Sequence, residues 1–478
     1  MNSILKTLSI VTILIIYSVP ASIGEEPAPY ASNTGIYSDG EKVGYSRISI
    51  KESDGLTLVR ESTGLNIKLL NKTQRVKTEA EYILSGYALA SFKFTMSSDA
   101  GDLSAVGIAD KGELRIKIKS LSGVTDITLP TEEEFTIFAL LPRWLADRPM
   151  SVGGEYAVPL FDPAAALMGI EAGDLVSTHK VAARETVEIP ALGSVDTYRV
   201  ESSFLGSRYT SWITPEGEVI KQTLPPGLTA FKEAGEDAGG GKYASFDIMR
   251  KTSIPSEVKL DNPRDLKYLK AEVTVRGERD HGLTDLSDGY RQYSKDDIVE
   301  IKPPDLDDLN SYTLPYKDDL FSEYISPTYL IQSGDALIKK KAGDIVKGGT
   351  DPIKAASRIN TWVYKNLKKE GTVSLPNARD VLQSRAGDCN EHAALFAALA
   401  RASGIPTKLA VGTIYIDGRF YYHAWNEVFV GQWIAVDPTY GQMPADATHI
   451  KLIEGDLKNS KDIMKLVGKL NIKVLDAS

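Results

Sequence analysis

The sequence predicts an α+β protein, in which an N-terminal antiparallel β-rich region precedes a core with a helix packed on an antiparallel sheet. Three patterns predict this fold class. Apolar and polar residues alternate in short runs over about residues 30–255, as they do in half-exposed strands. After residue 310, apolar residues recur at the helical period. Alternating runs joined by tight turns return after residue 406.

The composition is that of a soluble protein, and the chain is long enough for two or three domains. Its 478 residues are 42% hydrophobic and carry a net charge of −9. Because nucleic acid binding needs a concentrated basic face, this charge argues against a nucleic acid partner. We predict an export signal at 1–24, a β-rich domain at 25–255, a strand-containing segment and linker at 256–310, and a C-terminal domain at 311–478.

The first residues have the pattern of a signal peptide. Lys6 precedes the apolar stretch 8–16, and small residues at 19–24 offer a cleavage site after Gly24. The apolar stretch is too short for a comfortable membrane span, so we predict a secreted or periplasmic protein. The alternative is an uncleaved N-terminal membrane anchor.

The β-rich region contains clear strand and turn patterns. Residues 114–119 alternate strictly between apolar and basic side chains. Asp39-Gly40, Lys111-Gly112 and Glu216-Gly217 are typical of tight turns between strands. The sequence of this region shows no recognisable catalytic cluster. We therefore expect it to bind or position a substrate, or to dock at the cell envelope.

A change of period marks the start of the C-terminal domain. The acidic, proline-rich stretch 302–308 is the candidate linker. Asp351 and Pro352 then supply a helix N-cap and a first-turn proline. The apolar residues that follow form one stripe of a helix: Ile353, Ala356, Ile359, Val363 and Leu367.

The single cysteine, Cys389, stands at the predicted start of a second helix. A lone cysteine cannot form an internal disulfide, so it is a buried small side chain, a metal ligand or a reactive thiol. Asp388 and Glu391 form a capping-box pattern around it. At the first helical position, unpaired N–H groups and the helix dipole favour a negative charge. We therefore expect the pKa of Cys389 to be lowered toward the thiolate.

An antiparallel meander follows this helix. Residues 409–416 and 419–428 are strand-like and flank the two-residue turn Asp417-Gly418. A third strand, 433–437, comes after a short loop.

The meander supplies the two groups that a thiolate nucleophile needs, a base and a residue that orients the base. His423 is the candidate base, and Asp437 is the candidate orienting carboxylate. A two-residue turn between their strands would put them on opposite faces of the sheet. A three-residue loop through Val430 puts them on one face as a diagonal pair. This interpretation therefore requires that loop or a bulge.

Four sequence blocks resemble the transglutaminase-like superfamily in order and spacing, over roughly residues 320–456. The blocks are Gly387–His392, Ala400–Pro406, His423–Trp425 and Trp433–Pro438. The stretch 444–450 resembles prokaryotic members that carry a signal peptide and an N-terminal β-rich region.

The resemblance implies a papain-like cysteine enzyme core with Cys389, His423 and Asp437 as its catalytic triad. Such an enzyme transfers an acyl group from an amide through a thioester, and we expect no cofactor and no metal. We expect hydrolysis of a peptide or protein substrate, by a protease or deamidase, rather than cross-linking to an amine. The alternative is a non-catalytic binding scaffold at the cell envelope that uses the same fold.

Other roles for these residues stay open from the sequence. Cys389 could be an inert core thiol, or it could bind zinc together with His392 and His423. His392 lies one helical turn from Cys389 and could compete with His423 as the base. Trp362 could serve an oxyanion hole, as in some relatives, or pack within its helix. The remaining histidines carry no functional signal: His179, His281 and His449.

Overall fold

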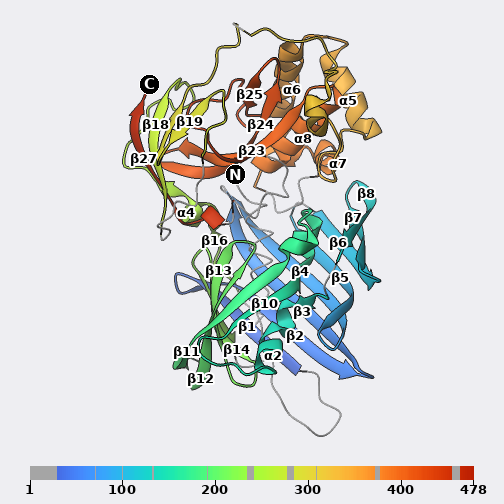
Figure 1. Cartoon of the computed structure of the whole chain (residues 1–478), viewed down its shortest axis with the longest axis vertical. Helices are drawn as coiled ribbons and strands as arrows, with labels where there is room; N and C mark the ends of the chain where they lie inside the picture. The colour runs from blue at the N-terminus through green and yellow to red at the C-terminus, as the bar shows by residue number, and fades with distance from the viewer. Residues whose placement is uncertain are drawn as a thin grey trace. The chain divides into compact units, whose positions relative to one another are not determined.

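The structure is a computed structural model (Figure 1). It describes residues 30–69, 72–99, 101–131, 134–190, 192–233, 242–276, 285–307, 309–371, 377–454, 463 and 465–478. The predicted export signal at 1–24 lies outside these residues. No helix in the described part of the chain is long and apolar enough to cross a membrane. Contacts divide the chain into two compact units, an N-terminal one up to Ile248 and a C-terminal one from Met249.

The N-terminal unit is built on one large sheet, with 16 strands among the described residues. Strands β1 to β8 form one meander, strands β10 to β15 form another, and the two meanders join at the β1–β15 pair. The described pairs are antiparallel except β9 with β10 and β3 with β16. The first meander comprises β1 (Tyr30–Ser38), β2 (Glu41–Ser53), β3 (Leu56–Leu69), β4 (Lys72–Ser85), β5 (Ala88–Ser98), β6 (Gly101–Asp110), β7 (Glu113–Ser120) and β8 (Gly123–Pro130). The other strands are β9 (Thr136–Ile137), β10 (Glu155–Phe161), β11 (Val176–Ile189), β12 (Gly193–Phe204), β13 (Ser207–Ile213), β14 (Val219–Leu224), β15 (Leu228–Glu233) and β16 (Phe246–Asp247).

This sheet confirms the predicted antiparallel β-rich region. In β7 the apolar side chains Leu114, Ile116 and Ile118 are buried, whereas the basic ones between them are exposed. The predicted turn between β1 and β2 has positive φ at both of its residues, 50° at Asp39 and 82° at Gly40. These values suit the type of turn that joins two twisted strands in two residues.

Short helices connect the strands of this unit: η1 (Phe138–Leu140), α2 (Leu141–Ala146), α3 (Pro163–Leu167) and η2 (Ala172–Asp174). All of α3 is buried. Its N-cap Asp162 accepts a hydrogen bond of 2.7 Å from the backbone N–H of Ala165. Phe161, at the end of β10, packs against Phe92 with ring centroids 4.6 Å apart. The core of the unit therefore includes α3 and the strand end before it.

The C-terminal unit has two sheets and a group of helices. One sheet has the order β17-β24-β23-β26, with β25 also paired to β24, and the other has the order β19-β20-β18-β27. Helices α5 to α8 gather together, away from β18 and β27 (Figure 1). The strands are β17 (Ile254–Pro255), β18 (Leu269–Val275), β19 (Gln292–Lys295), β20 (Ile298–Ile301), β21 (Lys368–Lys369), β22 (Ala386–Gly387), β23 (Thr407–Ile416), β24 (Arg419–Phe429), β25 (Trp433–Val436), β26 (Ile450–Glu454) and β27 (Leu470–Ala477). The helices are α4 (Ile248–Thr252), η4 (Asp319–Tyr324), α5 (Ala336–Val346), α6 (Pro352–Asn366), α7 (Ala378–Ser384) and α8 (Cys389–Ala402).

The segment 256–310, which includes the candidate linker, contributes strands to the C-terminal unit. Strand β18 pairs antiparallel with β20 on one side and with β27 on the other. Its Leu269, Ala271 and Val273 side chains are buried. The segment is thus tied to the end of the same unit, while the domain boundaries at 255 and 310 stay predictions.

Helix α8 is the central element of the C-terminal unit. It is buried from Cys389 to Arg401, and it packs against β23 and β24 as well as against α5, α6 and α7. The helix predicted from Pro352 is α6, whose N-cap Asp351 accepts a hydrogen bond from the N–H of Lys354 at 3.1 Å. The mixed fold class is therefore confirmed, with helices beside antiparallel strands in this unit.

Candidate active site

The start of helix α8 fixes the position of the cysteine. The Asp388 side chain accepts a hydrogen bond from the N–H of Asn390, and the Glu391 side chain accepts one from the N–H of Asp388, each at 2.9 Å. The predicted capping box is therefore confirmed, and it places Cys389 at the first helical position. Gly387 leaves room for the returning Glu391 side chain, because a Cβ at that glycine would lie only 2.2 Å from the Glu391 Cβ.

The meander places the candidate base beside the candidate carboxylate. Strands β24 and β25 pair in a register that leaves three residues, 430–432, in the connecting loop. One further pair in this register would set Asp437 opposite Trp425, on the sheet face that His423 shares. His423 Nε2 lies 2.8 Å from Asp437 Oδ2. The loop length and the diagonal pair expected from the sequence are confirmed.

Packing of α8 against β24 places Cys389 beside the strand that carries His423. A backbone hydrogen bond from Ala424, the neighbour of His423, reaches the Cys389 thiol. The Tyr440 ring lies against the imidazole, with centroids 5.8 Å apart. His423 Nδ1 is buried and has no hydrogen-bond partner among the described residues. That nitrogen is therefore available to exchange a proton with a reacting group.

A second histidine, His449, also contacts Asp437. Its Nε2 lies 3.0 Å from Asp437 Oδ2, the same oxygen that His423 contacts. Its Nδ1 lies 3.2 Å from the carbonyl oxygen of Asp446, whose carboxylate pairs with Arg264 at 2.9 Å. No sequence pattern singled out His449, and the structure places it against the candidate carboxylate; the only signal near it was the resemblance of the stretch 444–450 to prokaryotic relatives.

Comparison with protein families identifies the part of the chain that holds this geometry. Residues 339–438 match the model of the transglutaminase-like superfamily. The chain contains a transglutaminase-like domain. The matched range includes Cys389, His423 and Asp437 but ends before His449.

Individual relatives match parts of the chain. An uncharacterized protein from Haemophilus influenzae is 33% identical over 113 residues, which are 22% of this chain and 30% of that protein. The chain thus spans less than a third of this curated relative's length. A structure named as a candidate cysteine protease from Cytophaga hutchinsonii is 17% identical and has a TM-score of 0.29, over 44% of this chain and 86% of its own. Another, named as a candidate protease from Parabacteroides distasonis, is 13% identical and has a TM-score of 0.21, over 75% of this chain and 69% of its own.

The electrostatics of the transglutaminase-like site correct one prediction. Burial and the charge of Asp388 raise the pKa of the Cys389 thiol well above its usual range, although the backbone hydrogen bond from Ala424 opposes them. The predicted lowering of this pKa is therefore wrong. The helix N-terminus does favour a thiolate, but a fully buried position beside a carboxylate disfavours it more.

The other two members of the site are set in complementary states. Burial lowers the pKa of His423, and the Asp437 charge only partly opposes this. Burial would raise the pKa of Asp437, but attraction to His423 and hydrogen bonds from His423 and His449 lower it well below its usual range. At rest the site therefore holds a neutral thiol, a neutral imidazole and an ionised carboxylate.

The structure assigns His392 a local contact. Its Nδ1 lies 2.7 Å from the carbonyl oxygen of Asp388, one turn earlier in α8, and burial lowers its pKa. Among the described residues, the zinc set of Cys389, His392 and His423 does not form a group with metal-binding spacing. His423, with Asp437 beside it, is the better placed base.

One cluster in the domain has the spacing of metal ligands. Single atoms of His423, Asp437 and His449 lie within 4.8 Å of one another. The Nε2 atoms of His423 and His449 both hydrogen-bond the same Asp437 oxygen, so each of them carries a proton. A metal ligand would instead need a free lone pair on that nitrogen. The hydrogen bonds account for this spacing, and we interpret the cluster as a proton-bearing network.

The other residues considered from the sequence have separate contacts. Trp362, on α6, has two cationic side chains over its ring, with Lys341 Nζ 5.5 Å and Arg385 Cζ 4.7 Å from the ring centroid. These contacts fit a packing role. His179 lies in the N-terminal unit, where its Nδ1 is 2.8 Å from Ser202 Oγ. His281 lies outside the described residues.

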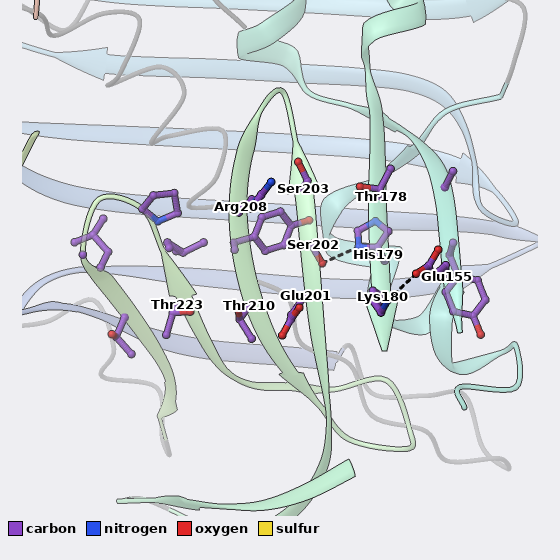
Figure 2. A pocket seen from close by; sticks show the side chains of 18 residues that line it. Glu155, Thr178, His179, Lys180, Glu201, Ser202, Ser203, Arg208, Thr210 and Thr223 are labelled. Carbon is purple, nitrogen blue, oxygen red and sulfur yellow. Dashed lines mark hydrogen bonds and ion pairs between the residues drawn. The ribbon is translucent and has the colours of Figure 1, made fainter. Parts of the chain in front are cut away.

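The N-terminal unit has a hollow of its own, of about 980 Å³ (Figure 2). Strands β10 to β15 line it. The register of these strands places six residues side by side in one row across the sheet: Glu155, Lys180, Glu201, Thr210, Thr223 and Thr229. Glu155 and Lys180 form an ion pair at 2.9 Å. This row offers hydroxyl and charged groups, and other lining residues, such as Leu224 and Leu228, are apolar.

Proposed function

We propose that this chain is an exported cysteine amide hydrolase of the transglutaminase-like type, acting on peptide or amide bonds through a thioester. Cys389 is the nucleophile, His423 the base and acid, and Asp437 the residue that orients the imidazole. The observation that carries the proposal is the 2.8 Å contact between His423 Nε2 and Asp437, which leaves Nδ1 for the thiol. This is the division of roles that nucleophilic catalysis requires.

The first half of the reaction makes the thioester. As Cys389 Sγ attacks the amide carbon, its proton moves to His423 Nδ1, and the sulfur–carbon bond forms. The carbonyl oxygen becomes an oxyanion that the backbone N–H of Cys389, at the start of α8, helps to stabilise. When the carbon–nitrogen bond breaks, His423 gives the proton to the departing amine. Asp437 holds the imidazole and stabilises its transient positive charge.

The second half decides between hydrolysis and transfer. In hydrolysis, His423 takes a proton from water, the hydroxide adds to the thioester carbon, and the carboxylic acid leaves as Cys389 regains its proton. In cross-linking, an amine replaces the water. We favour hydrolysis, with the substrate outside the cytoplasm, because the export signal predicted at 1–24 directs the chain there.

The test is a screen of peptide, amide and glutamine substrates with and without an added amine. We expect release of free acid without the amine, and no release by Cys389→Ala, whose circular dichroism should match that of the natural chain. Asp437→Asn should lower kcat by about 100-fold or more, because the imidazole loses its orienting charge. Turnover by Cys389→Ala would contradict the assignment, and turnover only with the amine would make the enzyme a transferase.

The N-terminal unit fits a role in substrate binding. Its hollow offers hydroxyl and charged side chains from six consecutive strands, and Arg208 on its wall has no ion pair among the described residues. A polar substrate such as a peptide chain would find hydrogen-bond partners there. We propose that the unit supplies binding energy remote from the thiol, and that association with the cell envelope is an alternative use of the same surface.

A further inference from the structure

The loop between β25 and β26 brings a fourth buried side chain against the triad. His449 is fully buried, and its Nε2 lies 3.0 Å from Asp437 Oδ2. That oxygen therefore receives both imidazoles, at 2.8 Å from His423 and 3.0 Å from His449. The other Asp437 oxygen accepts a hydrogen bond of 2.7 Å from the backbone N–H of Thr439. Both oxygens of the Asp437 carboxylate therefore accept hydrogen bonds.

Asp446 holds His449 from the opposite side. The His449 Nδ1 lies 3.2 Å from the Asp446 carbonyl oxygen and 3.4 Å from its carboxylate. The Asp446 carboxylate is fixed by the N–H of Thr448 at 2.8 Å and by Arg264 at 2.9 Å. Each nitrogen of His449 therefore faces an acceptor, and an imidazole can donate to both only when both nitrogens carry protons.

The charges around the imidazole agree with this protonation. Burial would lower the pKa of His449, but the Asp446 charge and the hydrogen bonds to Asp437 and Asp446 raise it above its usual value. The ionisable groups around His449 and its two carboxylates, Asp437 and Asp446, include His423, Arg264, Tyr440 and Lys369. Arg291 donates a hydrogen bond to the carbonyl oxygen of Asp446. The carboxylates of Asp437 and Asp446 therefore lie beside the His449 imidazole and the Arg264 guanidinium, whose positive charges offset theirs.

We propose that His449, as an imidazolium, is a positioning residue that fixes the Asp437 carboxylate and holds His423 neutral and ready to accept the thiol proton. Two linked effects follow. The hydrogen bond to Asp437 restricts the carboxylate to the orientation that His423 Nε2 meets. The positive charge, with the His449 ring centroid 5.7 Å from that of His423, opposes a second proton on His423.

The catalytic consequence rests on the proposed function, but the electrostatic one can be measured without a substrate. The chain has five histidines, so NMR of histidine-labelled protein gives few signals, and single His→Gln variants assign them. In His449→Gln an amide can still donate to Asp437, but the charge is gone. We expect the titration midpoint of His423 to rise by about one pH unit, while His449→Lys, which restores the charge, returns it toward the natural value.

His179→Gln is the matched control, because it removes another buried histidine from the N-terminal unit and should leave the His423 midpoint unchanged. With a substrate in hand, the low-pH limb of kcat/KM should shift to higher pH in His449→Gln by the same amount.

An unchanged or lowered His423 midpoint in folded His449→Gln would overturn the proposal. If that variant does not fold, the same NMR titration of the natural chain tests the proposal. His449 should stay protonated over the pH range in which His423 titrates, and a neutral His449 in that range would refute its role. Absence of turnover with the NMR shifts present would count against the proposed function alone.

Discussion

At the level of single residues, burial of the reacting groups sets the chemistry of this site. Because burial raises the pKa of Cys389 and lowers that of His423, both groups are neutral at rest. Asp437 stays ionised under the same burial because it receives hydrogen bonds from two imidazoles. Under the proposed mechanism, the thiol proton therefore moves during attack on the substrate, rather than before the substrate binds.

Alkylation of the single cysteine tests this resting state. Iodoacetamide reacts with thiolates, so its rate against pH follows the ionisation of Cys389 alone. A raised pKa means that the thiolate forms only at higher pH. We therefore expect the midpoint in the folded protein to lie above the midpoint of the same chain in guanidinium chloride. A folded midpoint below the denatured one would instead establish a standing thiolate–imidazolium pair, as the sequence alone had predicted.

What could be predicted about individual residues depended on how far the deciding contacts reach along the chain. The capping box joins Asp388 to a residue three positions away, and the diagonal pair of His423 and Asp437 follows from one loop length. Both were therefore predictable from local pattern. The pKa of Cys389 depends on burial by the whole unit, and the role of His449 depends on Arg264, far earlier in the chain. No local periodicity reports such contacts.

At the level of elements, the turn into helix α8 positions the nucleophile. Strand β22 ends at Gly387, and α8 begins two residues later at Cys389. The Glu391 side chain folds back over the glycine to cap the helix, so the backbone there has no room for a side chain. The capping box therefore holds the connection between β22 and α8 in place, and Cys389 lies at that connection.

Gly387→Ala should therefore disturb both stability and activity. Its Cβ would overlap the Glu391 side chain, so the capping box must open or the backbone must shift. We expect a loss of about 1–3 kcal/mol in the free energy of unfolding, measured by urea denaturation, and a fall in kcat. Gly343→Ala is the matched control, because it lies within α5 and no atom stands within 4 Å of the added Cβ. That control should gain up to about 1 kcal/mol from helix propensity. Equal effects of the two substitutions would mean that the capping box does not hold the turn.

At the level of the whole molecule, each unit has its own sheet system and its own candidate role. The N-terminal sheet carries a hollow lined by polar and apolar side chains, and the C-terminal unit carries the buried candidate triad. The fold class was predictable because strand and helix periods differ so clearly before and after residue 310. The place of segment 256–310 was not, because β18 finds its partner β27 at the other end of the unit.

Two fragments test this organisation. A chain of residues 249–478 keeps β18, β20 and β27 together, so it should be folded and should cleave a small synthetic amide. The same fragment should act more weakly than the whole chain on a large substrate, because only remote binding energy is lost. A fragment of residues 311–478 lacks β18, the partner of β27, and should be unstable to heat and to proteolysis. A stable and active 311–478 fragment would show that the smaller sheet is dispensable, and equal loss by 249–478 on both substrates would give the N-terminal unit a structural role.

The pairing of β18 with β27 also sets an order of assembly. Strand β18 pairs with β27, which lies far later in the sequence, so the smaller sheet closes only after β27 has been synthesised. The N-terminal sheet has all of its described strands long before that moment. The surface that we propose for substrate binding can therefore form before the smaller sheet of the C-terminal unit is complete. Under the proposed function, the hydrolase would thus lack part of its catalytic unit until β27 has been made.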